Sequence, residues 1–480
     1  MNIAQRSQLP YLRFLLPSRS PRGDVSYALW GLVVLVLWTL PACWTSPSSG
    51  DGPTAVEPSL SIPPSVPSTG RGLPPSVPLR GRQWPDFRGP GGQGHSPATG
   101  LPLKWSESEN VCWKVAIPGL GWSSPVVWGD QVWMTTSIAE GKSLRAVCVD
   151  LAGGQILHDF EVFAVEEPQI LDTKNSYASP TPVIEEGRVY VHYGTEGTAC
   201  ISTRNAEIVW SNRSLPVEHG SGPGNSPVLY ENLVIINLDG VDVQQVVALN
   251  KANGEIVWKL NRLGVMSDEP AKRRAFATPL VVESQEKAIL VSPGADQTQA
   301  IDVLTGEELW HVRYSGYSLV PRPITSGDVV YICTGFDEQK LWAIRLGGQG
   351  LVTDSHLLWE RKKQVPRTPS PILVGKAIYM VSDGGILSCL NAETGEERWI
   401  ERLGGNYSAS PIFADGRLFF CSEAGKVSVV EPADEPRIVA VNELEGRFLA
   451  SPAVVDSSLI LRTDTHLYRI ENMDRDQPRP

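Results

Sequence analysis

The chain has 480 residues, of which 41% are hydrophobic, so it is long enough to bury a large core. Its formal net charge is −11, with 42 Lys and Arg residues against 53 Asp and Glu residues. An acidic chain whose basic residues are scattered argues against a nucleic-acid-binding protein.

Residues 1–43 have the pattern of an export signal. Basic residues precede an uncharged apolar stretch at 25–40, which is followed by Pro41-Ala42-Cys43. Residues 40–43 resemble a bacterial lipobox, in which the Cys becomes the lipidated first residue, although Pro41 stands where a small residue is usual. Three alternatives stay open: a lipoprotein modified at Cys43, an uncleaved anchor helix, and simple secretion. Because all three export the rest of the chain, we expect a periplasmic or cell-envelope location, and the first two alternatives also give the expected membrane tether.

Residues 44–83 are rich in Pro, Ser and Gly. This composition is typical of a linker that is disordered or partly polyproline II, and no folded element is expected in it. Residues 473–480 are expected to form a polar tail.

From residue 84 to 472 the chain repeats one pattern. A Pro, usually preceded by Ser or Thr, opens a short apolar strand, and a turn and further β-rich strands follow it. The eight copies begin about 40 to 57 residues apart, the spacing of four-stranded propeller blades. They begin at Pro125, Pro182, Pro227, Pro279, Pro323, Pro371, Pro411 and Pro452.

A second marker follows in most copies, at 249–258, 301–310 and 390–399. Each segment has Asn-Gly or Thr-Gly, and a Trp four residues after the Gly. The Gly is expected to supply the positive-φ turn of a hairpin, and the Trp to wedge between neighbouring sheets. Similar segments end at Trp210 and Trp359, whereas the first and seventh copies lack the Trp.

The last copy lacks its fourth strand, and a strand without a blade lies upstream at 110–117 and carries Trp113. We expect this strand to close the last blade, as in many propellers. No segment has sustained helical periodicity. The sequence therefore predicts an all-β fold: an eight-bladed β-propeller of four-stranded antiparallel blades at 84–472, closed by its N-terminal strand.

These repeats resemble the pyrroloquinoline-quinone (PQQ) repeat family, whose Ala-x-Asp-x-x-Thr-Gly-x-x-x-Trp motif is nearly spelled out at 391–399. The opening WPDFRGP at 84–90 is also similar to the start of PQQ-like propeller proteins. The family includes quinoprotein dehydrogenases and non-catalytic BamB-like outer-membrane assembly lipoproteins, so the resemblance implies the fold without choosing a function.

Catalytic and metal-binding motifs are not evident. The six cysteines after Cys43 fall in different copies without metal-ligand spacing or a c-type haem motif, so buried single thiols are expected. The seven His residues show no metal spacing. No catalytic residue and no metal site are predicted, and a chance disulfide between blades stays open.

The loops that enter each Pro strand are the candidate binding site, because they are expected to meet at one rim of the central channel. They carry Trp122, Tyr177, Phe276, Tyr317, Arg322, Arg367, Tyr407 and Phe448. Aromatic and Arg side chains facing a funnel could bind a planar ligand or a peptide. In the alternative interpretation, the aromatic residues plug the channel and the arginines pair with carboxylates of the blades.

The first functional hypothesis is a non-catalytic cell-envelope module that binds an envelope or membrane protein as a scaffold. The alternative is a PQQ-dependent quinoprotein oxidoreductase that holds PQQ, with calcium in related enzymes, in the central funnel. A weaker third hypothesis is a glycan- or peptide-binding sensor.

Overall fold

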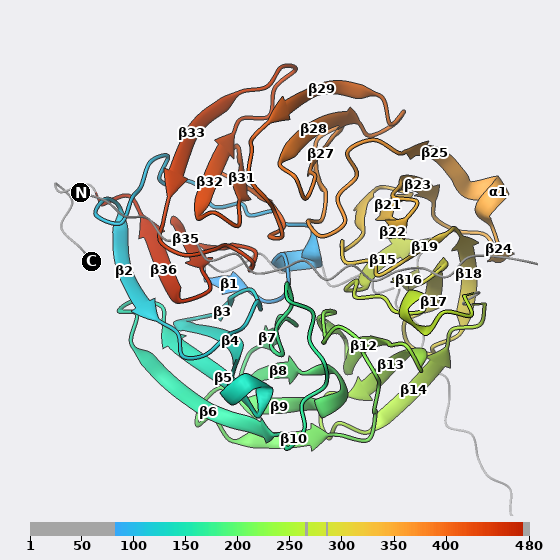
Figure 1. Cartoon of the computed structure of the whole chain (residues 1–480), viewed down its shortest axis with the longest axis horizontal. Coiled ribbons are helices and arrows are strands. Elements are labelled where there is room, and N and C mark those ends of the chain that lie inside the picture. Colours follow the sequence, from blue (N-terminus) through green and yellow to red (C-terminus); the bar gives the residue numbers. More distant parts are fainter. Residues whose placement is uncertain (1–81, 265–266, 285–286, 474–480) are drawn as a thin grey trace, which may run out of the picture. The chain divides into compact units, whose positions relative to one another are not determined.

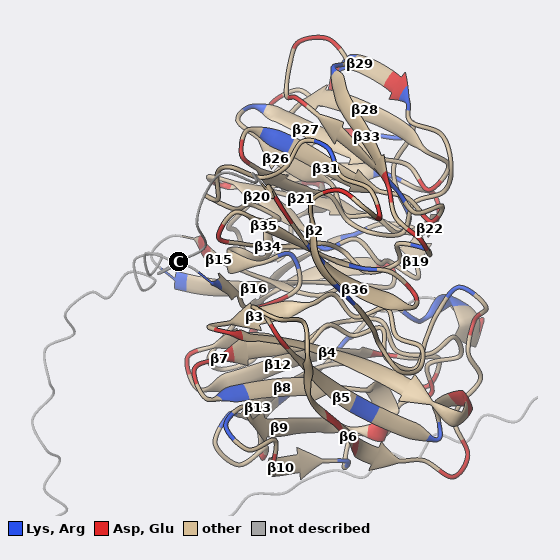
Figure 2. Ribbon diagram, turned by 90° about the vertical axis from the view of Figure 1, so that its left-hand side faces the viewer, with Lys and Arg blue, Asp and Glu red and all other residues tan. Residues whose placement is uncertain are grey.

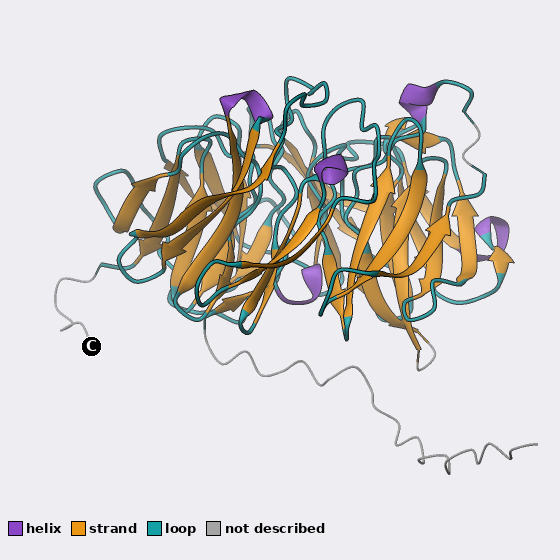
Figure 3. Cartoon of the chain, turned by 90° about the horizontal axis from the view of Figure 1, so that it is seen from below, coloured by secondary structure: helices purple, strands orange, loops and turns teal. Residues whose placement is uncertain are grey.

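The computed structural model describes residues 82–264, 267–284 and 287–473. The predicted export signal (1–43), nearly all of the linker (44–83) and the tail (473–480) lie outside these ranges, apart from residues 82, 83 and 473. Within the described ranges, the strands form eight radial antiparallel sheets around a central axis, and helix is confined to single turns (Figures 1 and 3). The predicted eight-bladed β-propeller is confirmed.

The blades follow one another in chain order, and each is described from its inner to its outer strand. Blade 1 consists of β3 (Val126–Trp128), β4 (Gln131–Ile138), β5 (Ser143–Asp150) and β6 (Ile156–Ala164), and blade 2 consists of β7 (Val183–Glu185), β8 (Arg188–His192), β9 (Thr198–Ser202) and β10 (Ile208–Asn212). Blade 3 consists of β11 (Val228–Tyr230), β12 (Leu233–Asp239), β13 (Gln244–Asn250) and β14 (Ile256–Asn261), and blade 4 consists of β15 (Leu280–Ser284), β16 (Lys287–Gly294), β17 (Gln297–Asp302) and β18 (Glu308–Arg313). Blade 5 consists of β20 (Ile324–Ser326), β21 (Val329–Cys333), β23 (Leu341–Arg345) and β25 (Leu357–Arg361), and blade 6 consists of β26 (Ile372–Val374), β27 (Ala377–Val381), β28 (Ile386–Asn391) and β29 (Glu397–Arg402). Blade 7 consists of β30 (Ile412–Ala414), β31 (Arg417–Cys421), β32 (Lys426–Val430) and β33 (Ile438–Glu443), and blade 8 consists of β34 (Ala453–Val455), β35 (Ser458–Arg462), β36 (His466–Glu471) and β2 (Val111–Ala116).

Short elements decorate this frame. A two-residue strand, β24 (Gly350–Leu351), adds in parallel to the outer edge of blade 4, and β19 (Gly316–Tyr317) pairs with β22 (Phe336–Asp337). The helical turns are η1 (Pro90–Gly92), η2 (Ala139–Gly141), η3 (Gly194–Glu196), η4 (Pro270–Lys272) and α1 (Thr353–His356). No helix of the described residues has the length and apolar character needed to span a bilayer.

The ring closes as predicted, because β2 forms the outer strand of blade 8 and pairs antiparallel with β36. Its Trp113 then packs on Gly154 of blade 1, and the indole N–H donates to the Leu151 carbonyl at 2.9 Å. The last blade is thus joined to the first both by a strand ladder and by the Trp contact between blades.

The Trp marker has the wedge role that its position predicts. In the described part of the chain, five indoles of the Trp marker donate a hydrogen bond to a backbone carbonyl of the next blade: Trp113, Trp210, Trp258, Trp359 and Trp399. Four of them also lie on the Gly of the following blade's turn, as Trp258 lies on Gly306, whose φ is +76°. The core is therefore a series of apolar layers between blades.

Five cysteines are buried in strands of separate blades: Cys148, Cys200, Cys333, Cys389 and Cys421. Burial raises the pKa of the Cys200 thiol to about 11, which keeps it protonated at neutral pH. Acidic and basic residues are interspersed along the strands and loops of the blades when the ring is viewed from the side (Figure 2).

Candidate functional site

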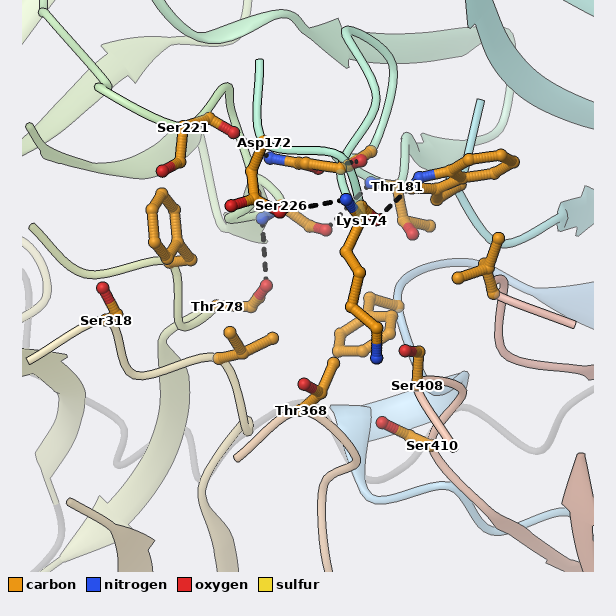
Figure 4. Close-up of a pocket in the computed structure, with 18 of the residues that line it drawn as sticks. Asp172, Lys174, Thr181, Ser221, Ser226, Thr278, Ser318, Thr368, Ser408 and Ser410 are labelled. Carbon is orange, nitrogen blue, oxygen red and sulfur yellow. Dashed lines mark hydrogen bonds between the residues drawn. The ribbon is translucent and has the colours of Figure 1, made fainter. Parts of the chain in front are cut away.

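A cavity of about 280 Å³ lies where the loops that enter the inner strands meet (Figure 4). Every blade contributes the residue three positions before its strand-opening Pro, such as Trp122 before Pro125 and Phe276 before Pro279. Most blades also contribute the residue directly before the Pro. This alternation is expected of extended segments, whose side chains point to opposite sides in turn.

Seven hydroxyl residues directly before the strand Pro form a ring that we call the crown: Ser124, Thr181, Ser226, Thr278, Ser370, Ser410 and Ser451. Each hydroxyl oxygen accepts a hydrogen bond of 2.9–3.0 Å from the backbone N–H of the equivalent residue in the preceding blade. The crown therefore links the blades around the axis, and all of its members except Ser370 line the cavity. It is interrupted at blade 5, where Arg322 holds the equivalent position.

We expect Ser410→Ala to destabilise the protein by about 1–3 kcal/mol, because the buried N–H of Ser370 loses its acceptor. Ser388→Ala provides the matched control, since the Ser388 hydroxyl is buried without a hydrogen-bond partner among the described residues. Removing that hydroxyl is expected to be neutral or stabilising. Urea unfolding of both variants measures the difference, and equal losses would show that the crown bonds contribute nothing.

The strap, residues 82–105, runs beneath the crown before the chain enters β2. It starts at the turns remote from the cavity, where Arg82 makes ion pairs with Asp130 and Asp456. Its first residues form β1 (Gln83–Trp84) on the inner edge of β3, and η1 lies at the hub of the ring (Figure 1). Phe87 then reaches the cavity and lines it.

The strap returns along the other side of the channel. His95 hydrogen-bonds through Nε2 to the Leu373 carbonyl at 2.7 Å, and Phe413 of blade 7 pairs with the backbone on either side of His95. Trp105 then donates its backbone N–H to Asn442 Oδ1 at 3.0 Å. The strap thus contacts blades on opposite sides of the axis and closes the cavity from below.

Arg322 points to the strap. Its Nε donates to the Pro279 carbonyl at 3.2 Å, and its Nη1 donates to the Phe87 carbonyl and lies 3.4 Å from Asp86 Oδ1. Burial raises the pKa of Asp86 to about 6, and the nearby Arg322 charge acts in the opposite direction. Asp86 is therefore mainly ionised at pH 7 and balances Arg322.

The strap itself carries a buried cation, Arg88, that has no carboxylate partner among the described residues. Arg88 is fully buried, and its Nε and Nη1 make no hydrogen bond to any described residue. Its Nη2 donates to the Gln93 carbonyl at 3.3 Å. Burial, followed by repulsion from Arg322, lowers the pKa of Arg88 to about 9, so the guanidinium stays charged at pH 7.

Charged groups also stand at the mouth of the cavity. Lys174 reaches across it, and its Nζ lies 2.9 Å from Glu423 Oε1 in blade 7. Arg274 donates through Nε to the Ser318 hydroxyl at 3.2 Å. Asp172 also lines the cavity, and its Oδ1 accepts the Lys174 backbone N–H at 2.9 Å.

Of the eight side chains predicted at the rim, the structure brings Trp122 and Phe276 into the cavity. Trp122 donates through its indole N–H to the Lys174 carbonyl at 3.1 Å, which fixes the loop that carries Lys174. Phe276 donates its backbone N–H to the Leu319 carbonyl at 2.7 Å.

The other six lie elsewhere. Tyr407 and Phe448 are buried in the core, and Tyr177 lines a recess between the first two blades. Tyr317 packs on Phe336, with ring centroids 5.9 Å apart. Arg322 is held by Asp86 of the strap and not by a carboxylate of a blade, and exposed Arg367 stacks over the Phe336 ring at 4.7 Å. Binding by any of these residues stays a prediction.

The residues missed in the cavity are mainly those of the crown, Lys174 and Phe336, and the buried Arg88 of the strap was missed as well. The crown had a signal in the sequence, the Ser or Thr before each Pro, which indicated only the start of a strand. Arg88 lies in the WPDFRGP segment, whose resemblance was noted without a structural role.

A protein-family model described as "Outer membrane protein assembly factor BamB" matches residues 105–349 and 351–449. The chain belongs to this family. BamB of Yersinia pestis is 24% identical over 69% of this chain and 80% of its own length, and BamB of Moranella endobia is 19% identical over 63% and 70%. A tetrathionate hydrolase of Acidianus ambivalens is 24% identical, but over only 31% of each protein.

Solved structures confirm the fold. The crystal structure of BamB from Moraxella catarrhalis aligns with a TM-score of 0.52 and 14% identity, covering 75% of this chain and 99% of that one. A europium-containing methanol dehydrogenase aligns with a TM-score of 0.59 and 8% identity, covering 80% of this chain and 90% of that one. At these identities the likeness extends to the fold alone.

Proposed function

We propose that this chain is a non-catalytic scaffold of the cell envelope that binds a protein partner. The observation that carries the proposal is the match of most of the propeller to the BamB family. The BamB relatives are named as outer-membrane protein assembly factors, so an envelope protein is the expected partner. A membrane tether through residues 1–43 belongs to the same proposal.

The loop face with the central cavity is the surface best suited to this role. It combines the aromatic side chains of Trp122, Phe276 and Phe336 with charged groups at the mouth. Aromatic anchors surrounded by polar groups are typical of protein-binding surfaces.

Cross-linking in intact cells, followed by purification from the membrane fraction and mass spectrometry, tests the proposal. We expect an envelope protein to be recovered with the full-length chain and to be lost from the Trp122→Ala/Phe276→Ala variant. Lys376→Ala/Glu393→Ala is the control, because that exposed ion pair joins the β26–β27 and β28–β29 turns and lines no part of the cavity.

Two results would contradict the scaffold: recovery of the chain with no envelope protein, or dye reduction with an alcohol by protein supplied with PQQ. The oxidoreductase alternative requires cations for the three carboxylates of PQQ. Arg322 and Arg367, the residues suggested for this role, do not line the cavity. The two arginines that the sequence suggested therefore stand outside the cavity, and no reaction step is derived through PQQ.

A further inference from the structure

We propose that the central cavity binds a carboxylate carried on an apolar stem, and that this is the group of the protein partner that enters the propeller. The inference rests on the proposed scaffold function and names the chemistry of its recognition site. It follows from the walls, the donors and the charges of one cavity.

The walls suit an apolar stem. Trp122, Phe276 and Phe336 stand at the sides, and Phe87 of the strap reaches the cavity from below. Rings of this kind bury much apolar area in a small space, which favours an aliphatic or aromatic segment over a fully hydrated ion.

The crown supplies donors. The hydroxyl oxygens of Ser124, Thr181, Ser226 and Ser451 each accept a backbone N–H, and none donates its own O–H to another described residue. A hydroxyl has one O–H donor, so these groups are left to donate to an acceptor in the cavity. Several convergent donors match a carboxylate, which only accepts.

Lys174 supplies a movable cation. Its pair with Glu423 spans the mouth, with 58% of the Lys174 side chain and 16% of the Glu423 side chain exposed. Glu423 is mostly buried and also accepts a hydrogen bond from the Ser408 hydroxyl at 2.6 Å, whereas the Lys174 side chain is exposed and free to turn, so an incoming carboxylate can replace Glu423 as the partner of Lys174. Figure 4 shows the Lys174 side chain extending over the cavity between the labelled hydroxyl residues.

A buried residue of the strap, next in the chain to the cavity-lining Phe87, adds a charge of the same sign. Arg88 follows Phe87 and is buried without a described carboxylate partner, whereas Asp86 balances Arg322. In a poorly solvated hub, this unbalanced positive charge favours an anion above it. Asp172 at the mouth acts against the anion, and its hydrogen bond to the Lys174 backbone holds it in place there.

Calorimetric titration of the full chain in detergent, at low ionic strength, tests the inference. The probes are N-acetylphenylalanine, whose carboxylate is terminal, and N-acetylglutamic acid amide, whose carboxylate is on a side chain. N-acetylphenylalanine amide is the neutral control. We expect at least one carboxylate probe to bind and the neutral amide to bind about tenfold more weakly or not at all.

Two charge variants sharpen the test. Lys174→Met is expected to weaken the carboxylate probe about tenfold, whereas Glu423→Gln, which frees Lys174 and removes a repelling charge, is expected to strengthen it. Neither change is expected to alter binding of a neutral ligand. Thermal unfolding of both variants checks that the fold is intact.

The inference would be overturned if N-acetylphenylalanine and its amide bound equally well, or if neither charge variant changed the affinity for the carboxylate probe. It would also be overturned if neither of the two acids bound. A partner still captured by cross-linking in that case would show that the scaffold function holds through another surface. The two carboxylate probes distinguish a chain terminus from an acidic side chain as the natural source.

Discussion

Gly306→Ala is expected to destabilise the propeller by about 2–4 kcal/mol. A Cβ at this position would lie 2.6 Å from Cδ2 of Trp258, so the indole that joins blades 3 and 4 must shift. Overpacking of this kind costs about 1–3 kcal/mol, and the backbone φ of +76° adds about 1 kcal/mol for a residue with a Cβ. The Trp258 hydrogen bond to the Val303 carbonyl, 3.1 Å long, is then strained as well.

Gly375→Ala separates the two costs. Gly375 has a φ of +59°, but a Cβ there would meet nothing within 4 Å. It is therefore expected to lose only about 1 kcal/mol, from the backbone. Urea unfolding monitored by circular dichroism measures both variants. If they lost the same free energy, the Trp wedge would not depend on a Gly beneath it.

Two buried histidines are expected to reduce the free energy of unfolding by about 4 kcal/mol between pH 7 and pH 5, and Asp86, whose folded pKa is raised to about 6, offsets about 1 kcal/mol of this loss. Burial, with repulsion from His219, lowers the pKa of His192 to about 3, and burial lowers the pKa of His219 to about 4. In the unfolded chain both titrate near 6.5, so only that state takes up protons at pH 5. Each His therefore contributes stability above pH 6.5 that is lost as the pH falls towards its folded pKa, about 2 kcal/mol at pH 5.

His219→Gln is expected to remove about half of that pH dependence, because the Gln amide can still accept the Thr195 backbone N–H that His219 Nε2 accepts at 3.1 Å. His356→Gln, at a half-exposed position in α1, is the control and is expected to retain it. Denaturant unfolding at pH 7 and pH 5 gives the comparison. A wild-type slope in His219→Gln would contradict a neutral buried His219.

The fold could be predicted because the same local pattern occurs in copy after copy. The Pro, the turn Gly and the Trp each have one structural use in a blade, and the missing strand of the last copy identified β2 as the closing strand. The path of the strap could not be predicted, because it forms few regular pairs. Its course depends on single contacts, such as those of Arg322 with Asp86 and Phe87.

The cavity was only partly predictable, and the reason is the alternation of side chains in the entering loops. Trp122 and Phe276 stand three positions before their Pro and line the cavity. Tyr407 and Phe448 stand four positions before Pro411 and Pro452, and their side chains are buried in the core and do not face the cavity. Counting from the Pro would have separated these two pairs. No count could have shown that Arg322 turns to the strap, because that depends on residues more than 200 positions away.

The strap also determines how the propeller would carry mechanical load. Tension applied to the chain ahead of Arg82 acts first on its ion pairs with Asp130 and Asp456, which belong to blades 1 and 8. It then acts along β1 and the hub, where contacts to blades 2, 5, 6 and 7 resist it together. Because the chain crosses the hub before it reaches β2, such a pull shears many bonds at once and does not peel one blade from the ring.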